Sequence, residues 1–74
     1  MTTPQTIAAL CIGGDWACAH GDFAGLSDVA RQLGAHVPAS LRPDLDAVVE
    51  ACHRDVDHAS ELWVRARAAA MVRA

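Results

Sequence analysis

The residues of this 74-residue chain that could bind a metal ion are concentrated in the stretch EACHRDVDHASELW, at positions 50–63. Glu50 and His53 have the E-x-x-H spacing that places two ligands on one side of a helix, as in di-iron helical bundles. Asp57 follows His53 by four positions and would extend that side by one turn. Glu50, His53 and Asp57 are therefore candidate metal ligands, with the missing ligands supplied by a facing helix or at a subunit interface.

An ordinary solvated helix surface explains the same stretch. Glu50 precedes Arg54 by four positions and Glu61 precedes Arg65 by four, which is the spacing of stabilising ion pairs on a helix. The chain has no second E-x-x-H motif, whereas di-iron bundles use two. We therefore expect surface ion pairs here and keep a metal-binding protein as the alternative.

The cysteines, Cys11, Cys18 and Cys52, indicate neither a zinc site nor a disulfide framework, because their number is odd and no C-x-x-C pair occurs. Each falls on an apolar stripe, where a free thiol packs as a small hydrophobic group. The sequence also lacks a glycine-rich phosphate loop and any motif that would orient a Cys–His pair. We expect no catalytic residues, no cofactor and no enzymatic activity.

The elements that must position these residues are predicted to be helices, since no segment shows the two-residue alternation of a strand. Thr3 and Pro4 are suited to begin a first helix, and Gly21 to end it. Asp22 would cap a second helix that runs to Gly34. Glycines 13 and 14 weaken the first helix unless another helix approaches closely there.

A loop with Pro38 separates the second helix from a third, which begins near residues 40–43 and passes Cys52. Residues 53–58 contain no glycine or proline, so they either turn or continue the helix towards the C terminus. We expect one all-α domain over residues 1–74, a small antiparallel bundle of three to four helices with the longest at the C-terminal end. The alternative architecture is two stacked helical hairpins.

The segment GDFAGLSDVARQL, preceded by a helix and an acidic turn, resembles the helical hairpins of the tetratricopeptide family. A shift of 33 positions, close to that family's period, aligns His20 with His53, Asp22 with Asp55 and Ser27 with Ser60. The resemblance covers residues 7–34 and, in its wider form, 41–70, and it implies paired antiparallel helices. The family's Leu-Gly and Tyr positions are not matched after Trp16.

Composition and charge argue against two classes of partner and favour one cellular compartment. The formal net charge is −3, and the six basic residues are arginines spread singly along the chain, so a nucleic-acid partner is not expected. No apolar run reaches transmembrane length, so no membrane partner is expected either. The absence of a basic leader and the odd number of cysteines favour a cytoplasmic protein.

The size of the chain predicts association. A domain this small buries a modest fraction of its surface and is marginally stable alone, and much of its apolar content is alanine. We name its largest aromatic side chains, Trp16, Phe23 and Trp63, as candidate interaction residues. Trp63 falls on the core stripe of its helix, whereas Trp16 lies off the stripe and suits a second interface. The function expected is a non-catalytic interaction module that binds a protein partner or itself, with a homodimer favoured.

Overall fold

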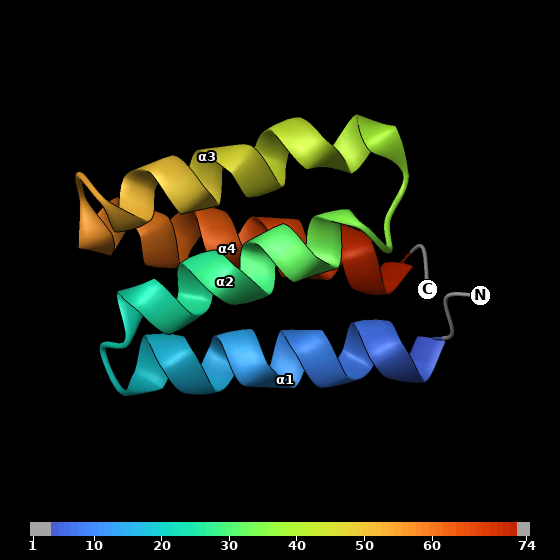
Figure 1. Cartoon of the computed structure of the whole chain (residues 1–74), viewed down its shortest axis with the longest axis horizontal. Coiled ribbons are helices and arrows are strands. Elements are labelled where there is room, and N and C mark those ends of the chain that lie inside the picture. The colour runs from blue at the N-terminus through green and yellow to red at the C-terminus, as the bar shows by residue number, and fades with distance from the viewer. Residues whose placement is uncertain (1–3, 73–74) are drawn as a thin grey trace.

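The computed structural model of the protein describes residues 4–72. Its four α-helices are α1 (Pro4–Ala19), α2 (Phe23–Gly34), α3 (Arg42–Cys52) and α4 (Val56–Val72), with a short 3-10 turn, η1 (Ala39–Leu41), before α3. The helices alternate in direction, so the start of α1 and the end of α4 lie at the same end of the bundle (Figure 1). The all-α prediction is confirmed, and α4 is the longest helix, while Thr3 lies outside the described residues.

The turn between α1 and α2 forms as its sequence predicts. Gly21 adopts a φ of 70°, a conformation that glycine adopts at little cost. The amide of Gly21 donates to the Cys18 carbonyl at 3.3 Å and that of Asp22 to the Ala17 carbonyl at 2.8 Å, which is the Schellman pattern of a helix end. The Asp22 carboxylate then accepts from the Gly25 amide at 2.9 Å and caps α2.

The turn between α3 and α4 settles the question that residues 53–58 left open, since α3 ends at Cys52 and α4 begins at Val56. The Asp55 amide donates to the Ala51 carbonyl at 2.8 Å. The Asp55 carboxylate accepts from the His58 amide at 3.3 Å. Asp55 therefore begins α4 as Asp22 begins α2, and the 33-residue shift aligns two hairpin turns with the same capping chemistry.

The two hairpins, α1–α2 and α3–α4, pack mainly through α2 against α3 and, over a smaller area, through α1 against α4. The second contact closes the helices into a bundle of 32 × 22 × 16 Å rather than an open stack. Its interior holds the largest fully buried side chains: Trp63, Leu26, Leu33, Val48 and Cys11. No helix within residues 4–72 is long and apolar enough to cross a membrane.

Candidate interaction surface

Helix α1 carries an apolar stripe on each of two sides. The inner stripe faces the core and contains Ile7, Cys11 and Gly14, all of which are buried. The outer stripe has a spacing of four and three residues, and all of its members are exposed: the polar Gln5 at its start, followed by the apolar Ala9, Ile12, Trp16 and Ala19. We call these five residues the outer seam. A helix that is apolar on both sides normally has both sides covered, so the outer seam is the first candidate for an interaction surface.

Gly14 fixes the rotation of α1 against α4. A Cβ atom built on Gly14 would overlap the six-membered ring of Trp63, with ring atoms Cε2 and Cη2 only 2.6 Å away. Glycine is therefore needed for the close approach of the two helices, which was one of the two interpretations of the glycine pair. Trp63 is 1% exposed and fills the space next to this glycine.

Asp15 adds a polar link at the same level of the bundle. The Trp63 indole Nε1 donates to Asp15 Oδ1 at 2.9 Å. Arg67 Nε lies 3.0 Å from the same oxygen, as an ion pair. Its N–H group does not have hydrogen-bond geometry towards any acceptor in the described part of the chain. With Gly14 and Asp15 both facing α4, the outer seam is directed towards solvent.

Trp16 is held in an ordered conformation on the outer seam. The rings of Trp16 and His20 stack with centroids 4.1 Å apart and an interplanar angle of 20°. His20 Nδ1 also lies 2.9 Å from the Trp16 carbonyl oxygen. Trp16 nevertheless remains 56% exposed. A large apolar ring that is already positioned loses less conformational entropy when a partner covers it.

Helix α4 extends the apolar surface beside α1. Val64 precedes Arg67 by three positions and Met71 follows it by four, so both lie on the side of α4 that holds the ion pair. Ile12 stands in the same relation to Asp15 on α1. The exposed fractions of Ile12, Val64 and Met71 are 67%, 61% and 42%. We call the outer seam together with Val64 and Met71 the α1/α4 face.

The aromatic residues named from the sequence occupy different environments. Trp16 lies at the centre of the outer seam. Phe23, the first residue of α2, is half-buried and packs against the core. Trp63 lies inside the bundle, and the contacts described for it are with α1 of the same chain. Val64 and Met71 cannot be assigned to an interaction surface from the sequence, because their place beside α1 depends on the pairing of Arg67 with Asp15.

The candidate metal ligands are distributed over two helices and the turn between them. Glu50, in the last turns of α3, forms an ion pair with Arg54 at 3.1 Å, as the i, i+4 spacing predicts. His53 lies in the turn after α3, and Asp57 in the first turn of α4. Glu61 lies 3.7 Å from His58 Nδ1 rather than pairing with Arg65. Within residues 4–72, no group of three or more His, Cys, Asp or Glu side chains is arranged to hold a metal ion.

The three cysteines are packed with the apolar residues, as their stripes predict. Cys11 and Cys52 are buried, and Cys18 packs against the core cluster. Burial raises the thiol pKa of all three, with a hydrogen bond to Ser60 opposing the shift of Cys18. A raised pKa lowers the thiolate fraction near neutral pH, and the thiolate is the nucleophile. The cysteines therefore have the environment of structural rather than reactive thiols.

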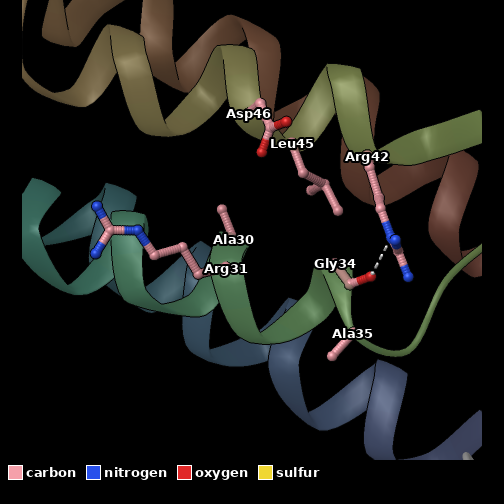
Figure 2. Close-up of a pocket in the computed structure, with 7 residues that line it drawn as sticks. All are labelled: Ala30, Arg31, Gly34, Ala35, Arg42, Leu45 and Asp46. Atoms are coloured by element: carbon pink, nitrogen blue, oxygen red, sulfur yellow. Dashed lines mark hydrogen bonds between the residues drawn. The ribbon is translucent and has the colours of Figure 1, made fainter. Parts of the chain in front are cut away.

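A shallow groove of about 380 Å³ lies between α2 and α3, and Figure 2 shows its lining. Leu45 points from α3 towards α2, and Arg31 and Arg42 lie at opposite ends of the groove. Arg42 Nε donates to the Gly34 carbonyl at 3.3 Å, which satisfies an acceptor at the end of α2. The groove is lined by Ala30, Arg31, Gly34, Ala35, Arg42, Leu45 and Asp46, none of which is a cysteine, serine or histidine.

Comparison of the chain with protein-family models, with curated proteins and with solved structures gave no match.

Proposed function

We propose that this chain is a small, non-catalytic helical interaction module, of the adaptor, chaperone-like or dimerising kind, that binds protein through the α1/α4 face. The observation that carries the proposal is the outer seam of α1, where Ile12 and Trp16 are exposed one turn apart on a helix whose other side already forms the core. Tryptophan is among the residues most enriched at the centres of protein interfaces.

The polar surroundings of the α1/α4 face support the same function. Asp15 is the one charged residue of α1, and its carboxylate is already engaged by Trp63 and Arg67. A partner could therefore cover the face without leaving an unpaired charge, which would be costly to bury. The face has an apolar centre with the Asp15–Arg67 ion pair beside it, and interfaces typically have an apolar core depleted of charge and a polar rim.

A photo-crosslinking amino acid at position 12 tests this proposal in cells of the source organism. We expect the probe at Ile12 to give one dominant protein adduct, which disappears when Trp16→Ala is added. The matched control is the same probe at Val56, a 44% exposed β-branched residue at the start of α4. Equal adducts at positions 12 and 56, or an adduct at 12 that is indifferent to Trp16→Ala, would contradict the proposal.

A further inference from the structure

We propose that the occupant of the α1/α4 face is a second copy of this chain, bound through an antiparallel contact between the two α1 helices. The inference rests on the proposed function, because it names the partner of the same surface. Three observations support it: the residue spacing of the outer seam, the lack of charged side chains in the seam, and the exposed area of the α1/α4 face.

The spacing of the outer seam matches helix-to-helix packing. Its residues follow one another at intervals of four, three, four and three positions from Gln5 to Ala19. This is the a/d spacing of a coiled-coil seam, in which side chains of one helix enter the gaps of the other. The seam is also graded in size, with two large residues, Ile12 and Trp16, between the small Ala9 and Ala19.

Because small residues flank the two large ones, two copies of the outer seam fit each other when their α1 helices run antiparallel. With a twofold axis at the level between Ile12 and Trp16, each Ile12 faces Trp16 of the second copy. Each Ala9 then faces Ala19 of the second copy, so the helices can approach closely on both sides of the aromatic centre. A twofold contact of this kind is isologous, the commonest arrangement of soluble homo-oligomers.

The charge distribution favours a second copy over another surface of the chain. The formal net charge of the chain is −3. A charged residue close to a twofold axis lies near the same residue of the second copy, so the two like charges repel each other. The outer seam itself has no charged side chain, and the carboxylate of Asp15 beside it is paired with Arg67. The outward surfaces of the other three helices do carry charges, including Asp28 and Arg31 on α2, Glu50 on α3, and Glu61 and Arg65 on α4. Of the described helices, α1 thus has the surface best suited to meet itself without repulsion.

The exposed area is sufficient for a reversible dimer. Ile12, Trp16, Val64 and Met71 leave roughly 100 Å² of apolar surface each, and with the alanines the α1/α4 face presents on the order of 500–600 Å² per chain. Two copies would bury about 1,000–1,200 Å² in total, at or just below the lower end of specific interfaces. An interface of this size is typical of weak or transient complexes, so we expect a reversible monomer–dimer equilibrium.

Sedimentation equilibrium of the purified full chain over a wide concentration range tests the inference. The wild type is expected to show a monomer–dimer equilibrium. Ile12→Glu should weaken it by about tenfold or more, since a carboxylate would be buried against apolar groups of the second copy. Val56→Glu is the matched control, because it adds the same charge at an exposed β-branched residue outside the face, and it should leave the equilibrium within about twofold of the wild type. Circular dichroism verifies that both variants are helical, and Trp16→Ala is the second seam variant if Ile12→Glu does not fold.

Failure of this inference differs from failure of the proposed function. A wild-type chain that stays monomeric at every concentration, or a dimer that both seam variants leave unchanged, would overturn the second copy as the occupant. The proposed function would still stand if the probe at position 12 gave a Trp16-dependent adduct with a different protein. It would fail with the inference if no such adduct formed.

Discussion

Replacing Gly14 by alanine is expected to destabilise the bundle, whereas the same change at Gly13 is expected to stabilise it. A methyl group at Gly14 would overlap the Trp63 ring. Since Trp63 is surrounded by the core, relief of this overlap requires helix α1 or the ring to move. Overpacking of this kind costs about 1–3 kcal/mol or more. The helix-propensity gain of alanine over glycine, about 1 kcal/mol, offsets only part of that cost.

Gly13 provides the matched control within the same helix. A Cβ atom there would have Val29 Cγ2 as its nearest neighbour at 3.8 Å, an ordinary van der Waals contact. Gly13→Ala should therefore raise the free energy of unfolding by about 1 kcal/mol. Urea denaturation followed by circular dichroism measures both changes. An equal gain for Gly13→Ala and Gly14→Ala would show that α1 does not pack on Trp63 as described.

Trp63→Ala and Trp16→Ala are the second pair of variants with opposite expected results. Trp63 is fully buried and donates a hydrogen bond to Asp15, so its truncation should cost about 3–5 kcal/mol. That loss is comparable with the whole stability expected for a domain of this size, about 3–5 kcal/mol. We therefore expect Trp63→Ala to be largely unfolded at room temperature in far-ultraviolet circular dichroism.

Trp16→Ala removes the same side chain from the same kind of element but from an exposed position. The monomer should keep its helicity, with the free energy of unfolding changed by no more than about 0.5 kcal/mol. Trp16→Ala should instead weaken self-association. Unfolding of the Trp16→Ala monomer would place this ring in the fold rather than in an interface, and a well-folded Trp63→Ala variant would contradict the core described for the bundle.

The local elements of this fold could be predicted from the sequence because short-range chemistry determines them. Gly21 and Asp22 identify the first hairpin turn through a left-handed glycine and a capping carboxylate. The second turn has the same carboxylate cap, Asp55, but no glycine or proline to end α3. Helical periodicity alone therefore does not decide whether residues 53–58 turn or continue as a helix, and the equivalence of Asp55 with Asp22 is the sequence signal of a turn there.

The α1/α4 face could be predicted only in part. Helical periodicity alone indicates that α1 has two stripes and that Trp16 lies off the stripe that faces the core. The position of Val64 and Met71 follows from the link between Asp15 and Trp63, which are 48 positions apart. Nothing in the local sequence encodes a contact of that separation. The grouping of Glu50, His53 and Asp57 was likewise derived from helical spacing, and the turn at residues 53–55 interrupts the helix on which that spacing depends.

In the proposed dimer, α1 uses one apolar side for folding and the other for association with a second copy. The concentration dependence of thermal unfolding tests this association most directly, because binding that occurs only in the folded state raises the unfolding midpoint as the protein concentration rises. We predict that the midpoint of the wild type increases with concentration and that the same increase for Ile12→Glu requires concentrations about tenfold or more higher. A wild-type midpoint that stays constant over the whole concentration range would contradict the account.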